Sequence, residues 1–102
     1  MEDDWDELHS VVETIVHMLG KYGISDWHER LVDINNRIGK RWREGPSLLL
    51  ELYGGMGSLT DLVIYPGQND KTDKGDVRRT NEELKHALER AYILAKGIDE
   101  GG

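Results

Sequence analysis

Two pairs of side chains have the spacing of metal ligands in helical bundles. Asp6 stands three residues before His9. Glu83 and His86 repeat this carboxylate–histidine spacing, which helical bundles use to hold two metal ions. The ligands of such a site must face the core, whereas a rotation of about 100° per residue turns both pairs away from the apolar positions of their helices. We therefore expect no metal site and no cofactor.

A glycine-rich segment is the second place where chemistry could occur. It consists of Gly54, Gly55, Met56, Gly57 and Ser58. Ser58 and Asp61 have the spacing of a helix capping box, and backbone amides at such a helix start can bind an anion. However, the segment lacks the Lys-Ser/Thr ending of a phosphate-binding loop. A packed structural corner is the leading interpretation, and a pocket for a small ligand or a groove for a peptide is the alternative.

No residue is predicted to be catalytic. The chain contains serine, histidine and aspartate, but no serine lies in the motif of a nucleophile elbow. The simplest role for Asp61 is to cap its own helical turn. The sequence therefore favours a protein that is not an enzyme.

Charged residues are distributed unevenly along the chain. Residues 1–14 carry six acids and no lysine or arginine, whereas residues 37–43 carry four bases and no acid. One interpretation is that these charges match helix dipoles, with acids at a helix start and bases at a helix end. The other is that the acidic end binds a basic partner, through Asp3, Asp4, Trp5, Asp6 and Glu7.

Length and composition restrict the class of protein. The chain has 102 residues, a net charge of −7 and no cysteine, which indicates one domain over residues 1–102 without a disulfide framework. The negative charge disfavours direct nucleic-acid binding, because a protein must bring cations to the phosphates. No apolar run reaches the roughly 18 residues of a membrane span. The first residues are acidic, unlike those of a signal peptide. We expect a cytoplasmic protein that has no membrane contact.

Apolar residues at helical spacing predict a first helix over residues 3–22. Its stripe consists of Trp5, Leu8, Val12, Ile15 and Leu19, which recur every three or four residues. Gly23 has the residue type expected just past a helix end. The stripe is wide enough to serve either a core or a homodimer.

The second helix is predicted to begin with Ser25 as its N-cap. A seam of apolar residues runs from Trp27 to Trp42, and the Gly45-Pro46 pair is expected to end the helix, because proline cannot continue it. The short connection to the first helix favours antiparallel packing of the two.

A short third helix is predicted over residues 47–53, with Pro46 at its first position. We expect it to be buried, because its leucines cover nearly every face. Residues 59–65 are ambiguous between a helical turn and an extended stretch. Residues 66–75 read as a polar, mobile loop.

The last helix is predicted over residues 76–96, with Asp76 as its N-cap and Gly97 at its end. Its seam consists of Val77, Leu84, Leu88, Ala91 and Ala95. The predicted fold class is all-α: a small antiparallel three-helix bundle with a short buried extra helix and a glycine-rich corner.

Residues 53–63 resemble the signature of a small bacterial domain family of unknown function. The core of that signature, Gly-Gly-Met-Gly-Ser-x-x-Asp-Leu-Val, is matched by residues 54–63. The similarity extends over most of the chain from Trp27 to Ala95, and the family has asparagine where this chain has Thr60. The resemblance implies a bacterial or phage origin and a helical fold. It implies no activity.

The leading functional hypothesis is a non-enzymatic protein-interaction domain. Small size, net negative charge and the acidic first turn favour a bacterial or phage protein of the immunity or inhibitor type that binds a basic partner. One alternative is a domain that binds a small ligand at residues 54–58. Another is a homo-oligomeric domain of unknown function.

Overall fold

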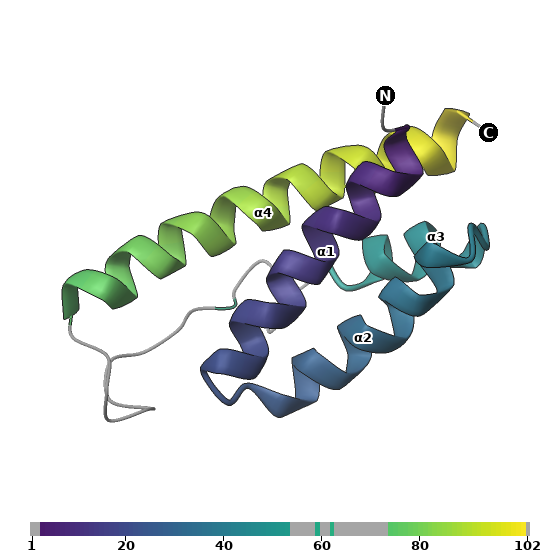
Figure 1. Ribbon diagram of the computed structural model, residues 1–102. Coiled ribbons are helices and arrows are strands. Elements are labelled where there is room, and N and C mark those ends of the chain that lie inside the picture. The colour runs from purple at the N-terminus through teal and green to yellow at the C-terminus, as the bar shows by residue number, and fades with distance from the viewer. Residues whose placement is uncertain (1–2, 54–58, 60–61, 63–73, 102) are drawn as a thin grey trace.

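The computed structural model describes residues 3–53, 59, 62 and 74–101 (Figure 1). Within these residues it contains four helices and no strand: α1 (Asp4–Lys21), α2 (Ser25–Gly39), α3 (Glu44–Glu51) and α4 (Lys74–Gly101). The predicted all-α class is confirmed for this part of the chain. The predicted corner at Gly54–Gly57, Ser58 and Asp61, and most of the predicted polar loop, lie outside the described residues.

Helix α1 begins and ends where its sequence predicts. The Asp3 side chain caps it by accepting a hydrogen bond of 2.9 Å from the Asp6 amide, and acids in the first turn suit the positive end of the helix dipole. Gly23, with a φ of 73°, follows the C-cap Tyr22 in the left-handed conformation that glycine adopts easily. The buried residues are Leu8, Val12, Ile15 and Leu19.

Helix α2 differs from its prediction at both ends. Ser25 is the first helical residue and not the N-cap, a position that Ile24 occupies without a side-chain hydrogen bond. The helix ends at Gly39, well before Gly45-Pro46, because the backbone reverses at Arg41, which has a φ of 59°. Trp42 was expected in the apolar seam, and it is instead 47% exposed.

Helix α3 begins earlier than predicted and contains Pro46 in its first turn, where a helix has no partner for the backbone N–H that proline lacks. Gly45 allows this turn to approach α2, since a Cβ at Gly45 would lie 2.9 Å from Ile38 Cγ1. Leu49 is fully buried, whereas Leu48 and Leu50 are only half-buried. The expectation that α3 is buried all round is therefore wrong.

Helix α4 is longer than predicted at both ends, with 28 residues. It continues through Gly97, where a Cβ would meet no atom within 4 Å, and one glycine in a helix costs only about 1 kcal/mol. Four predicted seam residues are buried: Leu84, Leu88, Ala91 and Ala95. Ile98 packs against the core beyond the predicted end, which favours continuation of the helix.

The four helices contact one another in a closed ring. Helix α1 packs on α2 and α4, and α3 packs on the same two helices (Figure 1). The start of α1 lies near the end of α2, where Asp3 meets Arg41. At the other end of α1, the Tyr22 hydroxyl lies 3.2 Å from that of Thr80 early in α4. This arrangement surrounds one apolar core.

Leu59 adds to the same core from beyond α3. Its side chain is fully buried, and its backbone N–H donates a 2.8 Å hydrogen bond to the carbonyl oxygen of Leu52. Among the described residues, no helix is both long and apolar enough to cross a membrane.

Candidate functional site

The acidic start of α1 is engaged by an arginine of the same chain. Arg41 Nη1 lies 2.6 Å from Asp3 Oδ2, and Arg41 Nη2 lies 3.3 Å from Asp6 Oδ1. The Arg41 guanidinium, followed by the Asp6 amide, holds the pKa of the Asp3 carboxyl below its ordinary value of 3.8. The Asp3 carboxylate in turn raises the pKa of Arg41. These two acids therefore orient the turn after α2.

The other predicted partner-binding residues have different surroundings. Glu7 pairs with Arg90 of α4, and Trp5 is half-buried and packs against the core. Asp4 is exposed in the first turn of α1. Three of the five predicted residues thus form ion pairs within the chain, and these pairs connect the start of α1 to the turn after α2 and to α4.

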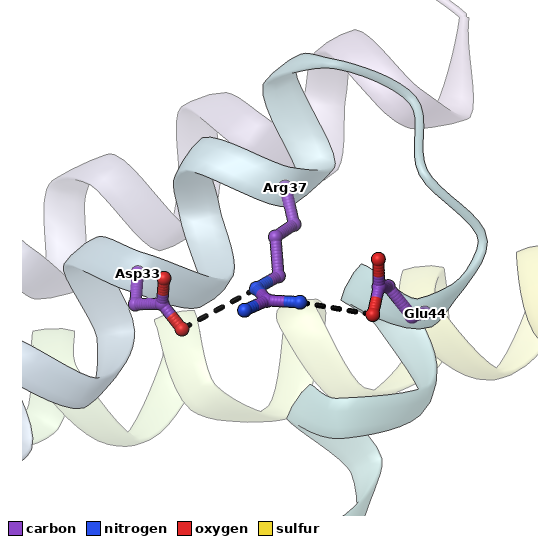
Figure 2. A network of polar contacts seen from close by, with 3 residues as sticks. All are labelled: Asp33, Arg37 and Glu44. Carbon is purple, nitrogen blue, oxygen red and sulfur yellow. Dashed lines mark hydrogen bonds and ion pairs between the residues drawn. The ribbon is translucent and has the colours of Figure 1, made fainter.

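Arg37 forms a second charged network where α2 meets α3 (Figure 2). Its Nε lies 3.3 Å from Asp33 Oδ2, one helical turn earlier, and its Nη1 lies 2.9 Å from Glu44 Oε2 at the start of α3. All three side chains are partly exposed, so solvent weakens each pair. The network connects the last turn of α2 to the start of α3.

The remaining cations of this segment stand on either side of an exposed tryptophan in the sequence. Lys40 Nζ lies 4.8 Å from the centroid of the Trp42 ring, a cation–π geometry. Arg43 is exposed and has no ion pair among the described residues. We call Lys40, Trp42 and Arg43 the basic turn. The uneven charge of residues 37–43 pointed to these cations, whereas the predicted helical seam wrongly placed Trp42 in the core.

The outer face of α4 carries an exposed apolar residue among charges of both signs, since Arg90 and Lys96 stand three residues before and after Ile93 and are also exposed. Ile93 is 62% exposed, the largest fraction among the exposed large apolar side chains. Glu89 lies one turn before it and Glu82 two turns before Glu89, so the three share a face, and both acids are exposed. We call Glu82, Glu89 and Ile93 the α4 ridge. Sequence reasoning missed it, although Ile93 stands off the predicted seam.

Two tyrosines join α3 to the side of α4 beside this ridge. The Tyr53 hydroxyl donates a 2.7 Å hydrogen bond to the carbonyl oxygen of Leu88, and burial raises the pKa of Tyr53. Its ring meets the Tyr92 ring edge-on, with centroids 5.1 Å apart. Lys96 donates a 3.4 Å hydrogen bond to the Tyr92 hydroxyl, which raises the pKa of Lys96. These contacts join α3 to α4 and hold the Tyr92 and Lys96 side chains beside the ridge.

The described histidines line the contact between α1 and α2, except for His86 on α4. A Cβ on Gly39 would lie 3.1 Å from the His9 ring, and one on Gly20 would lie 3.2 Å from the His28 ring. These two glycines let the helices approach. An open groove at the far end of this contact is lined by Val16, His17, Gly20, Lys21 and His28.

No group of three or more side chains in the described part of the chain is placed to hold a metal ion. Glu83 and His86 are both exposed, while Asp6 is occupied by Arg41. The only buried polar side chain found there is Asn35 of α2, whose Oδ1 has no hydrogen-bond partner among the described residues.

Comparison with known proteins gives a match to a family model. A family described as a domain of unknown function (DUF6966) matches residues 16–73, more than half of the chain. The match starts earlier than Trp27 and ends well before Ala95, the limits expected from the signature. It includes α2, α3 and the basic turn, and it ends before α4. No curated protein and no solved structure matches the chain.

Proposed function

The chain belongs to this family of domains of unknown function, and we propose that it is a non-enzymatic protein-interaction domain that binds a basic protein through the α4 ridge. The observation that carries the proposal is Ile93, which is 62% exposed on the same helix face as Glu82 and Glu89. Arg90 and Lys96, next to Ile93 on the helix, are paired with Glu7 and Glu100. The apolar anchor and the two unpaired acids on its face therefore fit a partner that presents an apolar pocket with lysines or arginines in line with it.

The charge of the whole chain supports a basic partner. Its net charge of −7 attracts a basic protein over distances of about a Debye length and raises the association rate. Neither Glu82 nor Glu89 has an ion pair within the described residues, whereas Asp3, Asp6 and Glu7 are already paired with arginines. The ridge is therefore better suited to this partner than the acidic start of α1.

The proposal extends to the finer architecture and to the origin of the chain. We infer that α1 runs antiparallel to both α2 and α4, that α3 is the short extra helix and connects α2 to α4, and that residues 54–58 form the corner after α3. Residues 54–63 would then be the family signature, and the protein a bacterial or phage domain of the inhibitor or immunity type that works in the cytoplasm.

Affinity capture from a host lysate, with charge-reversed baits, tests the ridge. Wild-type chain should recover a basic protein at low salt and release it as salt rises, because exposed charge pairs are screened. Glu82→Lys with Glu89→Lys should lower the recovery about tenfold or more, since like charges then face each other. Glu29→Lys with Glu51→Lys changes the net charge equally at exposed sites on α2 and α3 and should bind nearly as well as wild type.

Two results would contradict the proposal. In the first, both double variants lose the partner equally. The loss of binding would then come from the change in net charge and not from the ridge. In the second, the recovered protein stays bound at high salt and to the ridge variant, which would place its binding site elsewhere on the chain. Titration of the purified partner by calorimetry repeats the comparison with defined components.

A further inference from the structure

We propose that His17 and His28 bind a divalent transition-metal ion in the groove between the end of α1 and the start of α2. The groove has a volume of about 380 Å³ and is lined by Val16, His17, Gly20, Lys21 and His28. It lies where α1 is followed by α2 (Figure 1), away from the ridge on α4. The proposal is therefore independent of the binding of a basic protein.

The two imidazoles come from different helices and lie beside the same glycine. A Cβ at Gly20 would lie 3.2 Å from both Cδ2 and Nε2 of His28, so this edge of the His28 ring packs on the α1 backbone. His17 stands one turn before Gly20, on the same side of α1. Gly20 thus lets the His28 ring approach the helix that carries His17.

Both rings have nitrogens available for coordination. No hydrogen bond or ion pair in the described part of the chain involves the imidazole of His17 or His28, so an ion displaces no protein partner. Tetrahedral Zn²⁺, at Zn–N distances of about 2.0–2.1 Å, needs its two nitrogens roughly 3.3 Å apart. His17 is exposed and can change rotamer rapidly to meet this requirement, whereas the half-buried His28 is held in place.

The charges around the groove favour a cation over an anion. Glu13, one turn before His17 on the same face, is exposed and has no ion pair among the described residues. Lys21 also lines the groove, but its ammonium lies 5.5 Å from the centroid of the Tyr22 ring. The Tyr22 hydroxyl contacts Thr80 of α4, so the Lys21 charge is drawn toward α4. The net charge of −7 further attracts cations.

The number of protein ligands defines the kind of site. The described residues place no third metal-binding side chain with this pair, so water molecules complete the coordination. Imidazole suits zinc, copper and nickel, and a site with two protein ligands binds them less tightly than a structural site with four. The ion would join the end of α1 to the start of α2 and stabilise the folded chain, because it binds that state preferentially.

Calorimetric titration of the metal-free chain with zinc chloride tests the proposal, on protein that carries no histidine tag. We expect about one Zn²⁺ per chain. The affinity should fall about tenfold or more in His17→Ala and in His28→Ala, since even the outer partners of metal ligands contribute about 10–100-fold. Zn²⁺ should also raise the unfolding temperature of wild type but not that of either variant.

Each variant has a matched control among the other histidines. His9→Ala is the control for His28→Ala, because both rings are half-buried and each packs against a glycine of the other helix. His86→Ala is the control for His17→Ala, because both side chains are exposed. The two controls should bind Zn²⁺ as wild type does. Circular dichroism verifies the helix content of every variant before the titration.

Nuclear magnetic resonance identifies the coordinating rings directly. In a chain with ¹⁵N-labelled histidine, Zn²⁺ should shift the ring-nitrogen signals of His17 and His28 together. The signals of His9 and His86 should stay in place. This measurement uses the wild-type chain, so it does not depend on the stability of any variant.

Several outcomes would overturn the proposal. Wild-type chain that binds no Zn²⁺, or binding that is equally strong in His17→Ala or His28→Ala, would exclude this pair as the ligands. Binding that is lost in His9→Ala or His86→Ala, or shifted signals from those rings, would place the ion elsewhere. Because the measurement uses one pure chain and a metal ion, its failure leaves the binding of a basic protein unaffected, and a failed capture experiment leaves this result unaffected.

Discussion

At the scale of residues, Arg41 shows how distant parts of the sequence fix one backbone angle. A left-handed conformation is unfavourable for arginine, and nothing in residues 37–43 alone predicts it. The ion pairs of Arg41 with Asp3 and Asp6 hold the side chain and stabilise the reversal. The acids that the sequence suggested as a binding surface therefore form ion pairs within the chain and stabilise its fold.

Asp3→Asn separates the charge of this residue from its helix-capping role. Asparagine caps helices about as well as aspartate, but it cannot pair with Arg41. Because the folded-state pKa of Asp3 lies below 3.8, its contribution to stability is present above about pH 4 and is lost as the pH falls through the folded value. The urea midpoints of variant and wild type should therefore differ at neutral pH and converge in acid.

Asp4→Asn is the matched control for this pH dependence. Asp4 is also exposed in the first turn of α1 and has no ion pair within the described residues. Its substitution should give a smaller difference from wild type at neutral pH. An Asp3→Asn difference that stays constant from neutral pH to about pH 2 would contradict the role of the carboxylate.

At the scale of elements, close approach at glycines positions α3 against α2. A Cβ at Gly45 would lie 2.9 Å from Ile38 Cγ1 and 3.0 Å from the Ile38 backbone nitrogen, and backbone cannot move aside easily. Gly45→Ala should therefore lower the free energy of unfolding by about 1–3 kcal/mol, as overpacking does. Chemical denaturation monitored by circular dichroism measures this change.

Gly97→Ala provides a comparison with the opposite expected sign. Gly97 lies inside α4, and a Cβ there would meet nothing within 4 Å. Alanine should stabilise the chain by about 0.5–1 kcal/mol, because it loses less conformational entropy in a helix. Equal effects of the two substitutions would show that packing at Gly45 is not the cause.

The elements also show what the sequence could predict. The start and end of α1 were predictable, since an acidic cap, an apolar stripe and Gly23 all act locally. The end of α2 was not, because the reversal at Arg41 depends on Asp3 and on Asp6, which is 35 residues away in the sequence. The predicted end of α4 at Gly97 was wrong for a related reason. The packing of Ile98 on the core outweighs the low helix propensity of one glycine.

Prediction of the candidate site from sequence was similarly limited. Charge alone suggested the start of α1, yet Glu7 pairs with Arg90, 83 residues away, a contact that no local pattern reveals. The α4 ridge depends on which side of the helix faces α1 and α3. The packing of the whole chain determines which side of α4 is buried and which is exposed.

At the scale of the whole molecule, the helices of the closed ring pack around one common apolar core. Helices α2 and α4 do not contact each other within the described structure; α1 and α3 connect them. Loss of packing at α3 should therefore weaken two contacts at once. We expect the ring to unfold as one cooperative unit.

Leu49→Ala tests this shared core. Leu49 is fully buried in α3, so its truncation should lower the free energy of unfolding by about 2–5 kcal/mol. Ile93→Ala, at an exposed position, should change it by no more than about 0.5 kcal/mol. In both variants, unfolding curves from circular dichroism and tryptophan fluorescence should coincide, and separate transitions would contradict a single unit.

The exposure of Trp42 also gives the basic turn an optical signature. Trp5 and Trp27 are half-buried against the core, whereas Trp42 stands in solvent beside Lys40 and Arg43. Iodide ions gather near such cations and caesium ions are repelled from them. Iodide should therefore quench the emission of Trp42 selectively, and anything that covers the basic turn will be visible as a loss of that quenching, with no label attached to the chain.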